Sequence, residues 1–156
     1  MKAITLWQPW ASLIAVGVKR LETRSWYTGH RGPIAIHAAA KSPKIDSLMD
    51  AEQALEFIKL VYQYCGCAPG ELPHGAVIAT AELIECYKVF AHHSGGVIDL
   101  RGNKCEMTVL SASDEYKFGD FSLGRYAWRF MHPLPLAEPI PAKGKQGLWN
   151  WEEGAK

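Results

Sequence analysis

The chain has 156 residues, of which 48% are hydrophobic and 21% are charged, and its formal net charge is +1. This is the composition of a soluble globular protein large enough for one core. No apolar run reaches the roughly 18 residues that a membrane-spanning helix requires, which excludes that class of membrane protein. The first residues follow a strand pattern rather than a signal-peptide layout, so we expect a cytoplasmic protein with a single domain over residues 1–156.

The first forty residues predict short strands around one helix. Pro9 can stand in the first helical turn, where its missing N–H group is not needed, and Gly17 is a typical helix C-cap. The elements expected here are a strand over 2–6, a helix from Gln8 to Val16, an extended segment over 21–26, a turn over 27–33 and a buried strand over 33–40.

The remainder predicts one long helix and further strands separated by turns. The helix has an apolar face and a solvated acidic face. The elements expected here are that helix over 45–64, a loop over 65–75, a strand over 76–89, a mobile excursion or hairpin tip over 91–103, a strand over 105–110, a capped helical turn over 111–115, a loop over 118–124, a strand over 125–131 and a proline-rich segment over 133–141. This mixture predicts an α+β fold around a small barrel-like sheet.

Positive charge is concentrated in the first third of the chain. Residues 1–44 contain seven Lys or Arg and one acidic residue, Glu22, whereas the remainder contains ten basic and fifteen acidic residues. Such asymmetry favours an anionic partner bound at one face, although charge runs are often only solvated surface.

The four cysteines are interpreted as structural or incidental thiols. Cys65 and Cys67 are separated by one residue, not by the two residues of a zinc knuckle, and a chain of this size needs no disulfide framework. His74 follows seven residues later, which leaves a metal site open, but no motif predicts a metal or a cofactor.

The most informative stretch is residues 17–24, Gly-Val-Lys-Arg-Leu-Glu-Thr-Arg. Glu22 and Arg24 are two positions apart and share one face of an extended strand, with Lys19 just before it. Arginine offers a planar fork that suits phosphate, and the flat faces of neighbouring tryptophans, such as Trp26, suit unstacked bases. The stretch therefore predicts part of a site for an anionic, nucleotide-containing ligand.

Several motifs in the same order resemble the ASCH domain, a family of the PUA-like superfamily. The resemblance covers almost the whole chain. It is carried by Trp7-Gln8-Pro9-Trp10, by Gly17-x-Lys19-x-x-Glu22-x-Arg24, by 31–38 (Arg-Gly-Pro-Ile-Ala-Ile-His-Ala), by 118–121 (Phe-Gly-Asp-Phe), by Gly124-Arg125-Tyr126-Ala127-Trp128 and by 144–149 (Gly-Lys-Gln-Gly-Leu-Trp).

The resemblance implies a β-barrel of five to six strands with flanking helices, and a cleft that contains the 17–24 signature. It also implies action on RNA or nucleosides: some members are reported as amidohydrolases of N4-acetylcytidine, others as ribonucleases or nucleic-acid-binding modules. The small amidohydrolases have a threonine nucleophile where this chain has Glu22, so that mechanism does not carry over. Their later glutamate has a counterpart in the region of Asp114 or Glu115, without a definite alignment.

Two main hypotheses follow. In the first, the protein binds RNA, a single-stranded nucleic acid or a modified nucleoside in a basic, aromatic-lined cleft. In the second, it is a hydrolase of N4-acylated cytidine or RNA in which Glu22 activates water and Lys19 stabilises an oxyanion. A protein-interaction module is a third reading. The residues predicted to contact the ligand are Lys19, Glu22, Arg24, Trp26, Arg125, Tyr126 and Lys145.

Each candidate also has a structural alternative. Lys19 and Glu22 could form a simple ion pair, and Arg24 could clamp Glu22. Arg125 could equally contact a phosphate or form a structural ion pair. His37 on its apolar strand is more typical of a hydrogen-bonded core histidine than of a catalytic group.

Overall fold

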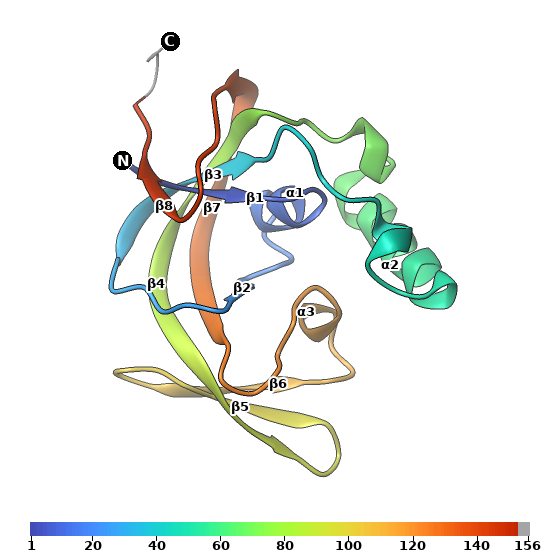
Figure 1. The fold of residues 1–156 in the computed structure, drawn as a ribbon, viewed down its shortest axis with the longest axis vertical. Coiled ribbons are helices and arrows are strands. Elements are labelled where there is room, and N and C mark those ends of the chain that lie inside the picture. The colour runs from blue at the N-terminus through green and yellow to red at the C-terminus, as the bar shows by residue number, and fades with distance from the viewer. Residues whose placement is uncertain (153–156) are drawn as a thin grey trace. The chain divides into compact units, whose positions relative to one another are not determined.

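The computed structural model describes residues 1–152. Strands outnumber helices along the chain, as an α+β fold predicts (Figure 1). The elements are β1 (Lys2–Leu6), α1 (Trp10–Ala15), β2 (Leu21–Arg24), β3 (Gly32–Ala38), the 3-10 helix η1 (Ile45–Ser47), α2 (Ala51–Cys65), the 3-10 helix η2 (Pro69–Glu71), β4 (Ala76–His93), β5 (Val97–Arg101), β6 (Glu106–Leu110), α3 (Asp114–Lys117), β7 (Tyr126–Pro141) and β8 (Leu148–Asn150).

The strands form one eight-stranded sheet that is not closed within residues 1–152. Eight strands exceed the five to six expected, because β5 and β8 also join the sheet. None of the helices in this part of the chain is long and apolar enough to cross a membrane.

The chain divides into two compact units, each assembled from separate segments. Unit 1 contains Met1–Val18, Pro33–Ala81 and the segment from Pro133 onward, and unit 2 contains Lys19–Gly32 and Glu82–His132. The long strands β4 and β7 therefore contribute residues to both units.

Unit 1 is organised around β1. This strand pairs in parallel with β3, with Ile4 opposite Ile36, and antiparallel with β8, with Ala3 opposite Trp149. Small and aromatic side chains from several segments fill the space beside these strands: Ala3, Ala35, Val77, Trp149 and Trp151. Helices α1 and α2 pack against each other through Trp10 and Phe57, whose ring centroids are 5.5 Å apart.

Helix α2 begins later than expected, at Ala51 rather than Ile45. Asp50 is its N-cap: its carboxylate accepts a hydrogen bond from the backbone N–H of Gln53, and the Gln53 side chain accepts one from the backbone N–H of Asp50. This capping box fixes the first turn at residue 51, so residues 45–47 form a separate 3-10 helix. The helix ends at Gly66, whose φ of 74° is the left-handed conformation that glycine adopts readily.

Unit 2 contains two antiparallel arrangements. Strand β2 pairs with the start of β7, and β4, β5 and β6 pair as a meander. Residues 91–103, expected to be a mobile excursion or a hairpin tip, form the end of β4, a tight turn and β5. Helix α3 begins after Ser113, whose hydroxyl accepts from the backbone N–H of Tyr116. The core of unit 2 contains a cluster of buried side chains: Leu21, Tyr87, Val89, Ile98, Leu100, Val109, Phe121 and Ala127.

Candidate nucleic-acid interface

Four side chains, two from β2 and two from β7, share one face of the ribbon that these strands form. Glu22 lies opposite Trp128 and Arg24 lies opposite Tyr126 in the antiparallel register. Because directly opposed residues project to the same side of a sheet, these four side chains lie on one face. The other face carries Leu21 and buries it in the core of unit 2. We call the surface formed by Glu22, Arg24, Tyr126 and the partly exposed Trp26, which packs on the buried Trp128, the signature face.

Lys19 lies behind this face and is 1% exposed. Its ammonium donates to the backbone carbonyl of Leu21 and lies 3.5 Å from Oε2 of Glu22. Both charges of this pair come from the signature stretch. The geometry makes Lys19 an internal support for the Glu22 carboxylate.

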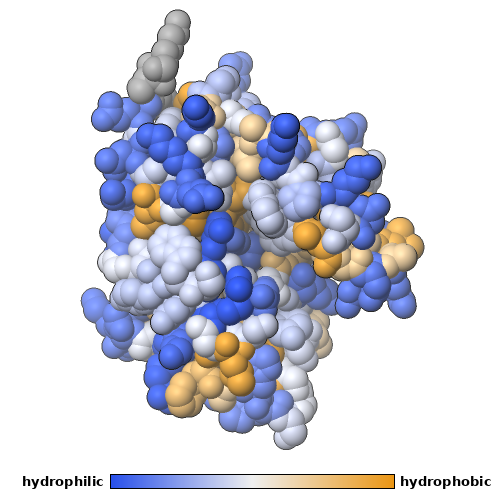
Figure 2. Space-filling view, in the orientation of Figure 1, coloured by the Kyte–Doolittle hydropathy of each residue, from blue (hydrophilic) through white to orange (hydrophobic). Residues whose placement is uncertain are grey.

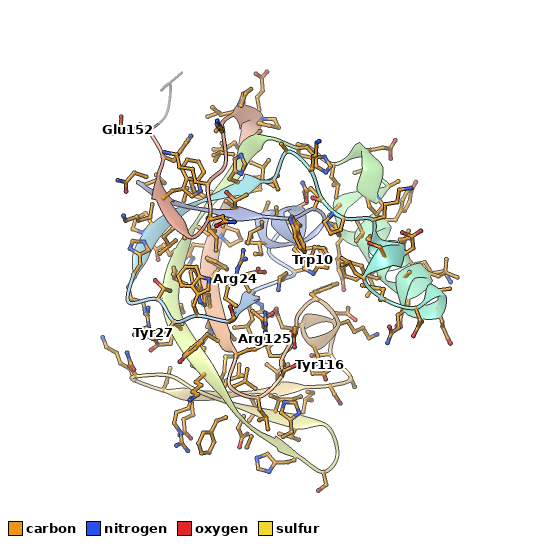
Figure 3. The ribbon with its side chains drawn as sticks, viewed as in Figure 1. Trp10, Arg24, Tyr27, Tyr116, Arg125 and Glu152 are labelled. Atoms are coloured by element: carbon orange, nitrogen blue, oxygen red, sulfur yellow. The ribbon has the colours of Figure 1, made fainter. Side chains whose placement is uncertain are left out.

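Arg24 holds the second oxygen of the same carboxylate. Its Nε lies 3.2 Å from Oε1 of Glu22, and its side chain is 29% exposed. Glu22 is thus fixed between two cations, one buried and one partly exposed. Figure 3 shows Arg24 and Tyr27 on the segment that also bears Glu22, with Arg125 nearby in the same unit.

Aromatic rings continue the signature face beyond Arg24. Trp26 is 37% exposed and packs edge-on against the buried Trp128, with ring centroids 4.5 Å apart. The indole N–H of Trp128 donates to the backbone carbonyl of Trp26 at 3.3 Å, which ties this residue to β7. Tyr27 and Tyr126 form a second edge-on pair, with centroids 5.8 Å apart. These flat surfaces beside a guanidinium are the features on which unstacked bases rest.

Arg125 forms an ion pair at the start of β7. Its Nε lies 3.2 Å from Oδ2 of Asp120, and its Nη2 donates to the carbonyl of Thr23 at 3.3 Å. Burial alone would raise the pKa of the Asp120 carboxyl, but hydrogen bonds from Ser122 and the charge of Arg125 outweigh burial and lower it. Arg125 therefore joins the 118–124 loop to the backbone of β2.

Glu115 contacts the backbone at the start of β2, a contact that the sequence did not predict. Its carboxylate accepts from the backbone N–H of Arg20 at 2.9 Å and from that of Leu21 at 2.9 Å. Helix α3 therefore holds the start of β2, where the signature stretch begins. Glu115 is therefore an acidic residue that the structure brings to the signature.

A further ion pair in unit 2, between Arg31 and Glu85, has no signal in the sequence. Arg31 and Glu85 bond directly, and Glu85 also accepts from the backbone N–H of Cys86 at 2.8 Å. Burial alone would raise the pKa of the Glu85 carboxyl, but this hydrogen bond and the Arg31 guanidinium lower it. The two residues are 54 positions apart, and no motif links them.

The remaining candidates lie in unit 1. Lys145 is exposed, Trp7 is 54% exposed, and Trp10 packs on Phe57. His37 is a core histidine, as its strand predicts: it is 1% exposed and its Nε2 donates to the carbonyl of Ala142 at 2.9 Å. In the part of the chain that the structure describes, no group of three His, Cys, Asp or Glu side chains is arranged to hold a metal ion.

Comparisons with known proteins agree with the motifs. The sequence model of the ASCH domain matches residues 4–120. Activating signal cointegrator 1 from Homo sapiens is 34% identical over 84 residues, and the protein of the same name from Mus musculus is 33% identical over 84 residues. In both cases the match covers 53% of this chain and 14% of the curated relative.

Proposed function

Since the chain belongs to the ASCH domain family, we propose that it binds RNA, or another single-stranded nucleic acid or modified nucleoside, through the signature face. The observation that carries the proposal is the placement of Arg24 against the fixed Glu22 carboxylate, with the partly exposed Trp26 packed on Trp128, the residue opposite Glu22. The family's PUA-like β-barrel and its cleft are part of the same proposal.

Each residue of the face has a distinct proposed role. Arg24 contacts a phosphate, because its planar guanidinium suits phosphate oxygens and its side chain is 29% exposed. Trp26 stacks on a base, and Tyr126 extends that aromatic surface. Glu22 accepts from a base edge with the lone pairs that Lys19 and Arg24 leave unused, and Lys19 acts from behind by fixing that carboxylate. Arg125 and the exposed Lys145 remain predicted phosphate contacts.

The test of phosphate binding is a salt titration of affinity for a single-stranded RNA. Wild-type affinity should fall linearly on a log–log plot. Arg24→Gln should weaken binding and reduce the slope by about 0.7, the value for one phosphate contact on a single strand. Arg101→Gln is the matched control, because it removes the same charge from an exposed residue of unit 2 that pairs with Glu106. Equal losses in the two variants would contradict a site at the signature face.

The test of stacking uses the tryptophans. Trp26→Ala should weaken binding by about 5- to 100-fold, since a base stacked on an aromatic ring contributes roughly 1–3 kcal/mol. Trp7→Ala, which also removes an exposed indole, should leave affinity unchanged if the signature face is the binding surface. Salt-independent binding, or no binding to any RNA or DNA, would overturn the proposed function.

A hydrolase of N4-acylated cytidine or RNA is the second candidate. It is favoured by the partly exposed Glu22 carboxylate, which is able to activate water and is held in place by the buried Lys19 ammonium. Incubation with N4-acetylcytidine and with labelled RNA tests it. Product formation by the wild type and its loss in Glu22→Gln would support hydrolysis; equal product from both proteins would exclude Glu22 as the base.

A further inference from the structure

Helix α2 carries two apolar stripes, and only one of them faces the core of its own unit. Ala54, Phe57 and Val61 are buried. The second stripe is exposed and runs beside the first: Ala51, Leu55, Ile58 and Tyr62, with exposed fractions of 55%, 38% and 62% for the last three. Figure 2 shows apolar side chains at the surface over α2.

The spacing of the exposed stripe separates it from scattered surface residues. Single exposed apolar side chains are normal on a soluble protein. Here, however, the positions advance by four, three and four residues, which is the alternation of the a and d positions of a heptad. Leu48, 44% exposed, lies three residues before Ala51 and extends the same series just ahead of the helix. A stripe with this period fits between the side chains of another helix.

Two charged residues beside the stripe indicate which partner helix would pack against it. Glu52 and Lys59 each follow a d position by one residue, so both occupy e positions. In an antiparallel pair of identical helices the e positions face each other, which places Glu52 opposite Lys59 of the partner subunit and Lys59 opposite Glu52 of the partner subunit. A parallel pair would instead direct e positions toward g positions, and here those are Ala54 and Val61, which are buried in unit 1.

From the stripe and this charge complementarity, we propose that two copies of this chain associate through antiparallel pairing of α2. The residues of this dimer all lie in unit 1, whereas the signature face lies in unit 2. With 15 residues, α2 is about 22 Å long. A contact made by one such helix is at the small end of specific interfaces, so we expect a reversible dimer with a dissociation constant in roughly the micromolar range.

Sedimentation velocity over protein concentrations from about 1 µM to about 1 mM tests the association. The wild type should pass from monomer to dimer in this range. Ile58→Glu places a charge in the centre of the stripe and should raise the dissociation constant about tenfold or more. Gln63→Glu is the matched control, because it adds the same charge at an exposed position of α2 outside the stripe and should leave association unchanged. Far-ultraviolet circular dichroism checks that both variants retain their helices.

Charge reversal tests the antiparallel orientation. Lys59→Glu should weaken the dimer, because two Glu52 side chains would each face a like charge, and adding Glu52→Lys should restore it. A wild type that stays monomeric over the whole concentration range overturns the proposal, and the stripe would then be a surface for a different protein. A dimer that is indifferent to Ile58→Glu, or that the double reversal does not restore, also overturns it.

Discussion

The Lys19 ammonium lies 3.5 Å from the Glu22 carboxylate, with side-chain exposures of 0% and 13% respectively. A buried ammonium requires compensation, and the Glu22 carboxylate and the Leu21 carbonyl supply it. Lys19 therefore stabilises the signature stretch from inside, and the charge that reaches the surface belongs to Arg24.

Replacement of Lys19 by Met should destabilise the protein by about 1–3 kcal/mol, since the Glu22 carboxylate and the Leu21 carbonyl both lose a buried donor, although Arg24 still pairs with Glu22. Urea unfolding monitored by tryptophan fluorescence measures the loss. Lys44→Met, at an exposed lysine, should change the free energy of unfolding by no more than about 0.5 kcal/mol. Similar values for the two variants would contradict the buried pairing.

Asp50→Ala should cost about 1 kcal/mol, the usual contribution of a side-chain N-cap. The carboxylate accepts from the backbone N–H of Gln53, and alanine leaves that donor without its capping partner. Asp46→Ala removes an equal charge from an exposed position four residues earlier and should have a much smaller effect. Thermal unfolding of the two variants separates loss of the cap from loss of charge.

Acid should weaken the protein through His37. Burial lowers the pKa of this imidazole, while its hydrogen bond to Ala142 raises it by a smaller amount. The unfolded chain therefore binds a proton more readily than the native protein, so the stability contributed by neutral His37 is complete above about pH 6.5 and declines as pH falls below that value.

His37→Gln provides the comparison, because the glutamine amide can donate to the Ala142 carbonyl without titrating. Urea unfolding at several pH values from about 7.5 to about 5 should show a smaller acid-dependent loss in this variant than in the wild type. Parallel pH profiles would show that His37 does not contribute to acid sensitivity.

Gly144→Ala should be destabilising by about 1–3 kcal/mol, the usual range for overpacking. A Cβ atom there would lie 2.5 Å from Cε1 of His37 and 2.8 Å from Oγ1 of Thr5. Gly70→Ala is the control, because a Cβ at that position meets no atom within 4 Å. The difference between the two midpoints of thermal unfolding measures how closely residue 144 approaches the histidine.

Local sequence signals predicted most of the elements but placed some of their ends wrongly. The long apolar series over 45–64 concealed the capping box at Asp50, which starts α2 at Ala51. The prolines of 133–141 suggested a break, yet β7 continues to Pro141. They occupy alternate positions, 133, 135, 139 and 141, so in a regular strand the missing N–H groups all point to the same side.

The signature face could be located from sequence, because the two-residue spacing of Glu22 and Arg24 requires only that β2 be a strand. The burial of Lys19 could not be predicted from the sequence, since it depends on how distant segments of unit 2 pack around this residue. The same holds for Glu115, which reaches the backbone of Arg20 from 95 positions away. No short-range pattern encodes such a contact.

The pairing of β2 with β7 also determines when the signature face can form during synthesis. Glu22 emerges from the ribosome about a hundred residues before its opposite residue, Trp128. Closing so long a loop is slow compared with local helix formation. A nascent chain ending at residue 120, where the family match ends, would carry every charge of the 17–24 signature and none of the strand that aligns them. Ligand binding is therefore expected only after β7 has been synthesised.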